Sequence, residues 1–378
     1  MTSTINQATA APSVSQLETT SAVAGDKKQG AVIGDGYTKE MWYFGAPGYK
    51  VKRGKTLQKI IMGVPVLIGR DKEGKPFSMV DICPHQGIPL SCGHFDGKEI
   101  ECCFHGWRFD TSGACTDIPA LCDDQKMNLC SVKTKSYRCA EHQGNIWIYV
   151  GDKTENLPEI PTVRGLENHA CDQTTTTLTL PNHIDYNVLA LIDTAHVPYV
   201  HNAWWWRNGR NIKEKAKQYI PDGTGWTMVR HKPSKHSVVF KAFGELMQTE
   251  IGFRLPGCRV EYITINDRTL LGGISTLTPI DENTTELNHT TYWTIKGFKP
   301  IVEPIVQYFV TTFLKQDKVV AEKQKPILKL KPQLIYTIKD SGTPGRWYLD
   351  CKREWNNAAE SGQPFNNPIK ATILRWRT

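Results

Sequence analysis

The feature that most constrains this chain is a pair of cysteine-histidine motifs, Cys83-x-His85 and Cys102-x-x-His105, separated by sixteen residues. Both motifs lie in stretches rich in Pro and Gly, which predict two loops that can fold toward a common point. Packing alone readily explains one buried Cys or His, but not two pairs at these spacings. The chain has eleven cysteines, an odd number with uneven spacing. Reduced thiols in a cytoplasmic protein are therefore expected rather than a disulfide framework.

Two inorganic sites fit the pattern. Two Cys and two His can hold one zinc ion tetrahedrally, or a [2Fe–2S] cluster with the thiolates on one iron and the imidazoles on the other. Zinc fingers close a ligand pair over a short helix, whereas here both pairs lie in loops between strands, which favours the cluster. A zinc-stabilised binding module stays open as the alternative. We interpret Cys92 and Cys103 as small core thiols outside the site.

A second group of metal-type ligands follows in "DYNVLALIDTAHVPYVH". Asp193 and His196 are three residues apart and are expected to share a helical face, within a helix predicted around 183–196. Pro198 disfavours helix at Val197 and is expected to turn the chain, so that His196 and His201 can converge. Two His and one distant carboxylate form the triad that holds oxygen-activating Fe(II).

The distant carboxylate is sought on a predicted helix at about 301–325. Asp317 fills a gap in the apolar stripe of that helix, and a buried acid is costly unless a cation pairs with it. A metal is one such cation; an ordinary salt bridge is the alternative. The stripe consists of Val302, Val306, Phe309, Phe313 and Val320.

These motifs resemble those of the Rieske-type non-haem iron oxygenases over roughly residues 40–350. "CPHQGIPLSCG…CFHGWRFD" is similar to the family's Rieske domain, and its four cluster ligands match Cys83, His85, Cys102 and His105. The usual Pro-Trp before the last His is Cys-Phe here. The family's catalytic pattern matches Asp193, His196, His201 and Asp317 in "KQDKVVAEKQ". Many relatives carry Asn where this chain has Ala190.

The resemblance implies a terminal oxygenase component with one Rieske [2Fe–2S] cluster and one Fe(II) per subunit. It would use O₂ to hydroxylate, demethylate or desaturate a small organic substrate, with a dioxygenase outcome not excluded. It also implies a head-to-tail homotrimer in which Asp193 bridges the cluster of one subunit and the iron of its neighbour. The rival from another class is a Rieske electron-transfer protein without oxygenase turnover.

The expected fold is α+β. A disordered tail at residues 1–36 is expected to precede a small all-β Rieske domain at 37–155. A catalytic domain at 156–378 follows, with a large antiparallel sheet flanked by helices in a helix-grip-like arrangement. Strands are predicted at 59–69 and 76–82, a hairpin at 133–152 turning at Gln143-Gly144, and further strands at 225–231, 237–244, 248–256, 259–265, 270–280 and 286–295.

Composition limits the partners. The net charge of +8 is mild and scattered, so no nucleic-acid surface is indicated. No apolar run is long enough for a membrane span, and an organelle transit peptide is not favoured, because the first 26 residues lack Arg. Without a dinucleotide fingerprint, the chain is expected to need an external ferredoxin or NAD(P)H-dependent reductase. The substrate and the roles of Trp204, Trp205 and Trp206 stay open.

Overall fold

The computed structural model of the chain describes residues 33–166, 171–201, 212–232, 247–266, 268–294, 299–330, 334–336 and 338–378. The described residues fall within one compact unit, Ala31–Thr378. They form three antiparallel sheets and four α-helices, which confirms the expected α+β class. The predicted boundary at residue 155 remains a prediction. The predicted strand at 237–244 and most of the predicted tail lie outside the described residues.

The first two sheets lie between residues 41 and 150. A six-stranded sheet has the order β1 (Met41–Pro47), β10 (Asn145–Val150), β9 (Ser136–His142), β4 (Pro76–Val80), β3 (Val64–Arg70), β2 (Lys55–Ile61). A four-stranded sheet has the order β5 (His94–Phe95), β6 (Glu99–Glu101), β7 (Arg108–Asp110), β8 (Cys115–Asp117).

Two tight turns set the register of the six-stranded sheet. Gln143 and Gly144 have φ of 45° and 70° and join β9 to β10, as the sequence predicted. Met62 and Gly63, with φ of 53° and 78°, join β2 to β3 in the same way. The single strand predicted at 59–69 was therefore wrong, because a two-residue turn with positive φ divides it.

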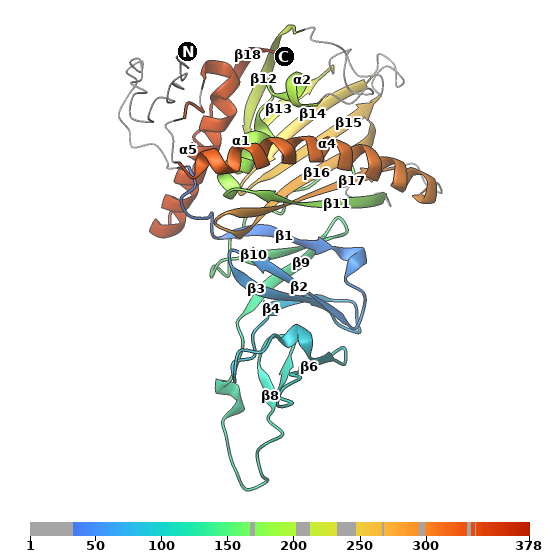
Figure 1. Ribbon diagram of the computed structural model, residues 1–378, viewed down its shortest axis with the longest axis vertical. Helices are drawn as coiled ribbons and strands as arrows, with labels where there is room; N and C mark the ends of the chain where they lie inside the picture. Colours follow the sequence, from blue (N-terminus) through green and yellow to red (C-terminus); the bar gives the residue numbers. More distant parts are fainter. Residues whose placement is uncertain are drawn as a thin grey trace, which may run out of the picture. The chain divides into compact units, whose positions relative to one another are not determined.

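The third sheet has eight strands and carries the helices. Its order is β11 (Asp172–Pro181), β17 (Thr284–Trp293), β16 (Arg268–Asp281), β15 (Cys258–Ile265), β14 (Met247–Arg254), β13 (Gly225–His231), β12 (Glu214–Asp222), β18 (Thr372–Arg377). The helices are α1 (Ile184–Ile192), α2 (Val197–Val200), α4 (Lys299–Leu328) and α5 (Lys339–Ser361). Figure 1 shows α4 crossing one face of this sheet, where it packs mainly against β11.

The two faces of the large sheet bury different clusters. Leu277 of β16 packs with side chains of α1, α4 and α5. Ile274 of the same strand packs with Trp42 of β1 and Trp147 of β10. Residues three apart in a strand point to opposite faces. The helices therefore cover one face of the sheet, and β1 and β10 cover the other.

The helices predicted around 183–196 and at about 301–325 are present as α1 and α4, but two details of the prediction were wrong. The helix predicted around 183–196 ends at Ile192, and Val197 is helical although Pro198 follows it. Pro198 lies in the first turn of α2, where the missing N–H needs no partner. Helix α5 was not predicted, because "SGTPG" in its first two turns is typical of a loop.

A buried ion pair anchors the start of α1. The Asp185 carboxylate is fully buried and accepts hydrogen bonds from Lys352 Nζ at 2.9 Å to each oxygen, and from the Tyr348 hydroxyl of α5. The Gly34 N–H also donates to it, at 2.9 Å. The last residues of the predicted tail thus hold α1 against α5, which orients the helix that leads to Asp193.

Candidate functional site

The two predicted cysteine-histidine loops have the same hydrogen-bond pattern. In each loop the cysteine N–H donates to the carbonyl five residues later, and the N–H four residues later donates back to the cysteine carbonyl. These bonds are 2.8 and 2.9 Å in the loop of Cys83, and 2.9 and 3.0 Å in the loop of Cys102. Gly87 and Gly106 occupy the same position in the two loops with φ of +78° and +71°, a conformation that favours glycine.

The loops bring the four predicted ligands together with thiols inside and imidazoles outside. Cys83 and Cys102 are buried and form no disulfide, and burial raises the pKa of the Cys83 thiol. His85 and His105 are exposed, with ring centroids 4.6 Å apart. Two buried thiols beside two adjacent rings fit a [2Fe–2S] cluster with sulfur ligands on the inner iron and nitrogen ligands on the outer iron.

The prediction that Cys92 and Cys103 are core thiols was wrong. Both are exposed. Cys92 ends a short 3₁₀ turn, and Cys103 lies in the loop of Cys102, where the turn directs successive side chains away from the core.

The second group of predicted ligands begins where α1 ends. Asp193 is the C-cap of α1 with an extended backbone, and its Oδ1 accepts the Ala195 N–H at 2.7 Å. Its Oδ2 lies 3.7 Å from His196 Nδ1, an ion-pair distance. Burial raises the pKa of Asp193, but the contacts with His196 and Ala195 outweigh it and hold the pKa below its usual value. The two side chains thus meet in the non-helical segment between α1 and α2, and not on one helical face as predicted.

His196, His201 and Asp317 converge on a common point. His196 Nε2 and His201 Nε2 are 3.3 Å apart, and Asp317 Oδ1 lies 3.7 and 3.4 Å from them, respectively. A point equidistant from these three atoms lies about 2.0 Å from each, within the range of metal–nitrogen and metal–oxygen bonds. Among the described residues this is the group of donors able to hold a single metal ion.

The protonation of these groups favours a cation between them. The His201 Nδ1 faces the Gln316 Oε1 at 3.0 Å, which makes Nδ1 the donor and leaves a lone pair on Nε2. Burial lowers the pKa of His201 to about 3, so the ring is neutral at ordinary pH. Burial also raises the pKa of Asp317 to about 6. Facing lone pairs repel unless a cation binds them, and the donors suit Fe(II).

Two further residues, neither of them predicted from the sequence, orient this group. Gln316 directly precedes Asp317 in the quoted motif and fixes the His201 tautomer. Arg259 of β15 donates from Nη1 to the Leu191 carbonyl at 3.2 Å, which holds the end of α1 just before Asp193. The position of Gln316 next to the predicted ligand was a usable signal. Arg259 carries no comparable signal, because only the pairing of strands brings it there.

We expect Gln316→Leu to weaken iron binding by about 10- to 100-fold, because the His201 Nδ1–H loses its acceptor. Iron retention against a chelator would measure this, with the visible spectrum of the cluster unchanged. Gln307→Leu is the control, since the Gln307 amide on the same helix donates to Thr174. Equal iron retention in the two variants would contradict the role of Gln316.

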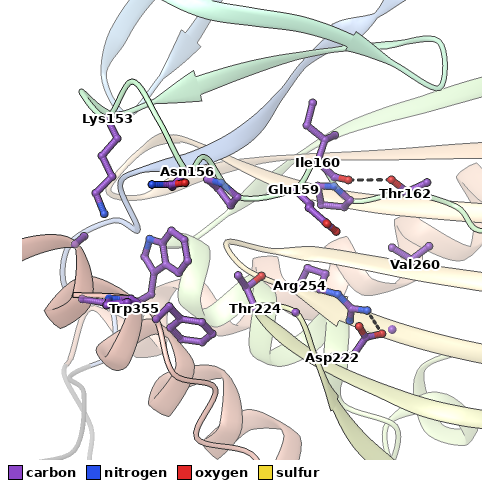
Figure 2. Close-up of a pocket in the computed structure, with 18 of the residues that line it drawn as sticks. Lys153, Asn156, Glu159, Ile160, Thr162, Asp222, Thr224, Arg254, Val260 and Trp355 are labelled. Carbon is purple, nitrogen blue, oxygen red and sulfur yellow. Dashed lines mark hydrogen bonds and ion pairs between the residues drawn. The ribbon is translucent and has the colours of Figure 1, made fainter. Parts of the chain in front are cut away.

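A cavity of about 470 Å³ adjoins the converging ligands. His196, Asp317 and Asp193 line it, together with aliphatic side chains of α1, α4, β16 and β17. A larger cavity, of about 620 Å³, shares none of these residues (Figure 2). In that larger cavity Arg254 and Arg164 both pair with Asp222, and none of the predicted metal ligands lines it. The smaller cavity is therefore the candidate substrate pocket. Trp204, Trp205 and Trp206 lie outside the described residues.

Two family models match the chain. Residues 41–143 match the Rieske [2Fe-2S] domain, and residues 190–339 match the vanillate O-demethylase oxygenase C-terminal domain. The first match contains all four predicted cluster ligands, and the second contains the three converging ligands and Asp193. The two groups of predicted ligands thus lie in the two matched regions.

Several of the similar proteins are named as oxygenases. The chain is 26% identical over 341 residues to chlorophyllide a oxygenase of Arabidopsis thaliana, covering 87% of this chain but only 60% of that protein. It is 23% identical to the iron-sulfur subunit of the toluene-4-sulfonate monooxygenase system of Comamonas testosteroni, covering 83% and 96% of the two chains. The structure of dicamba monooxygenase bound to dicamba has a TM-score of 0.69 at 20% identity, covering 86% and 98%, which shows a shared fold.

Proposed function

The chain belongs to the Rieske-type non-haem iron oxygenases, and on that premise we propose that it is a terminal oxygenase component acting on a small organic substrate. The observation that carries the proposal is the convergence of His196, His201 and Asp317 beside a cavity of about 470 Å³. An electron carrier needs the Cys83 and Cys102 loops alone and has no use for three further ligands at a pocket. The reaction would hydroxylate, demethylate or desaturate the substrate.

The Rieske domain indicates a [2Fe–2S] cluster, which supplies single electrons at a mild potential, and Fe(II) at the second site would supply the ability to use O₂. The residues of the chain hold and orient these groups. Cys83 and Cys102 would hold the inner iron, and His85 and His105 the outer one. Incorporation of one oxygen atom into a C–H bond consumes two electrons and two protons and leaves water as the second product.

Electrons would pass between subunits of a head-to-tail homotrimer. Asp193 has a side chain 42% exposed, so it can meet a neighbouring subunit while it faces His196. The exposed His85 and His105 are the groups that a neighbour's Asp193 would meet. A carboxylate held between two imidazoles orients both of them.

The electron donor would be an external ferredoxin or reductase, since the sequence shows no dinucleotide fingerprint. None of the described helices, including the 30-residue α4, has an apolar stretch able to cross a membrane.

Toluene-4-sulfonate, the compound named for one relative, is an organic anion. Whether this chain also accepts an anionic substrate depends on the residues that line its own pocket.

Iron analysis of the purified, reconstituted chain tests the proposal. A terminal oxygenase should contain about three irons per chain, two of them in an acid-labile sulfide cluster. A Rieske electron carrier should contain about two, and a zinc-stabilised binding module should be colourless and free of sulfide. Two irons per chain in protein reconstituted with excess Fe(II) would reject the oxygenase proposal.

A further inference from the structure

The walls of the candidate substrate pocket are mostly aliphatic. Side chains from α1, α4 and the three neighbouring strands β11, β17 and β16 of the large sheet form most of them. Such walls favour apolar ligands through burial of apolar surface. The aliphatic lining includes Leu189, Leu277, Leu287, Leu314 and Val320.

The described lining residues include two carboxylates but no Lys or Arg. The carboxylates are Asp193 and Asp317. With a divalent ion at Asp317, these two charges balance that of the metal, so the described wall keeps no net positive charge. An anionic ligand would lose its hydration here and would find no Lys or Arg partner among the described lining residues.

One buried hydroxyl among the described lining residues lacks a partner. Tyr336 lines the pocket, and its hydroxyl oxygen is buried with no hydrogen-bond partner. Its ring lies 6.1 Å from that of Tyr186, which also lines the pocket. Burial raises the pKa of Tyr336 to about 12, so the hydroxyl is a neutral donor at ordinary pH. An unpaired buried hydroxyl is unfavourable, and a bound acceptor would relieve that penalty.

The residues beside Tyr336 give the pocket an apolar rim. Ile335 is 82% exposed and Ile338 is 62% exposed, and both line the pocket. Val320 of α4, 47% exposed, also belongs to the lining. Exposed apolar side chains grouped at a cavity indicate a binding surface. A ligand that enters here passes aliphatic groups before it reaches the ligands of the metal.

We propose that the pocket binds a neutral, predominantly apolar molecule with one hydrogen-bond-accepting oxygen, that the Tyr336 hydroxyl donates to this oxygen, and that organic anions are disfavoured. The proposal rests on the proposed oxygenase function for the use of the pocket. Tyr336 then determines specificity, since its hydroxyl fixes the oxygen-bearing end of the molecule in the pocket.

Calorimetric titration with matched probes tests the proposal on the full-length, metal-loaded chain. The probes are 1-acetyladamantane, adamantane-1-carboxylate and 1-ethyladamantane, which share one apolar cage and differ in charge and hydrogen bonding. The ketone should bind at least about tenfold more tightly than the carboxylate. Tyr336→Phe should weaken the binding of the ketone by about two- to tenfold and leave the affinity for the hydrocarbon unchanged.

Thermal unfolding separates this role from a structural one. Tyr336→Phe removes an unpaired buried hydroxyl, so its melting temperature should equal or exceed that of the natural chain. Tyr308→Phe on the outer side of α4, where Tyr308 is 63% exposed, is the control and should bind all three probes as the natural chain does.

Three results would overturn the proposal. They are tighter or equal binding of the carboxylate, undiminished ketone binding by Tyr336→Phe, and no binding of either the ketone or the hydrocarbon. Failure of the oxygenase function would appear separately as two irons per chain, with probe binding intact. The two inferences can therefore fail independently.

Discussion

Asp317→Ala should abolish substrate oxidation while the red-brown cluster spectrum stays intact. The Asp317 carboxylate is the one anionic member of the converging group, with Oδ1 at 3.4 and 3.7 Å from the two imidazole nitrogens. Without it, two neutral imidazoles would have to hold a divalent ion, and iron should fall from about three to about two per chain. Product formation in single turnover with chemically reduced protein, together with iron analysis, measures both effects.

The matched control is Glu322→Ala, which removes a carboxylate from the same helix. Glu322 is exposed and lies 3.8 Å from Lys318, so its ion pair contributes little. It should retain three irons and full turnover. If Asp317→Ala kept its third iron and its activity, Asp317 would be an ordinary buried acid and the second site would lose its anionic ligand.

Asp193→Asn should keep both metal centres and lower turnover by about 100-fold or more, because the charge between the two centres is lost. The amide retains an oxygen for the Ala195 N–H, so the end of α1 should keep its conformation. The lesion should appear as slow reoxidation of the reduced cluster on mixing with O₂ and substrate. Stopped-flow absorbance of the cluster measures this rate directly.

Asp152→Asn is the control for the loss of a carboxylate, since the Asp152 side chain is 86% exposed and pairs with Lys135 at the surface. The reduced cluster of this variant should reoxidise at the wild-type rate. If the cluster of the Asp193→Asn variant reoxidised at the wild-type rate, electrons would reach the second site without the Asp193 carboxylate. The proposed contact between subunits would then need another residue.

The sequence predicted the ligands because their chemistry restricts which residues can serve. Cys83, His85, Cys102 and His105 were identified by spacing, and the structure places all four in two loops with the same hydrogen-bond pattern. Asp317 was identified because an acid interrupts an apolar stripe, and the structure places it with His196 and His201. Their roles as ligands stay predictions, but their proximity is a structural fact.

Local turn chemistry was less reliable as a guide. Gln143-Gly144 was recognised as a hairpin turn, whereas Met62-Gly63 was not, since Met rarely adopts a positive φ. Helix α5 was missed because its buried face, which includes Pro344, Tyr348 and Cys351, begins within a loop-like stretch. That face becomes stable only by packing on α1 and the large sheet.

The sequence by itself determined which atoms can bind metal, because a thiol, an imidazole or a carboxylate is a property of one residue, and short spacings constrain near neighbours. Only the tertiary structure decided how distant groups meet. Arg259 reaches the end of α1 through strand pairing, and Lys352 neutralises Asp185 from 167 residues away. Tyr336, which lies between α4 and α5, lines a pocket formed mostly by helices and strands distant in the sequence. Such contacts depend on the burial of whole faces of sheet and helix, a cooperative free energy that no local pattern encodes.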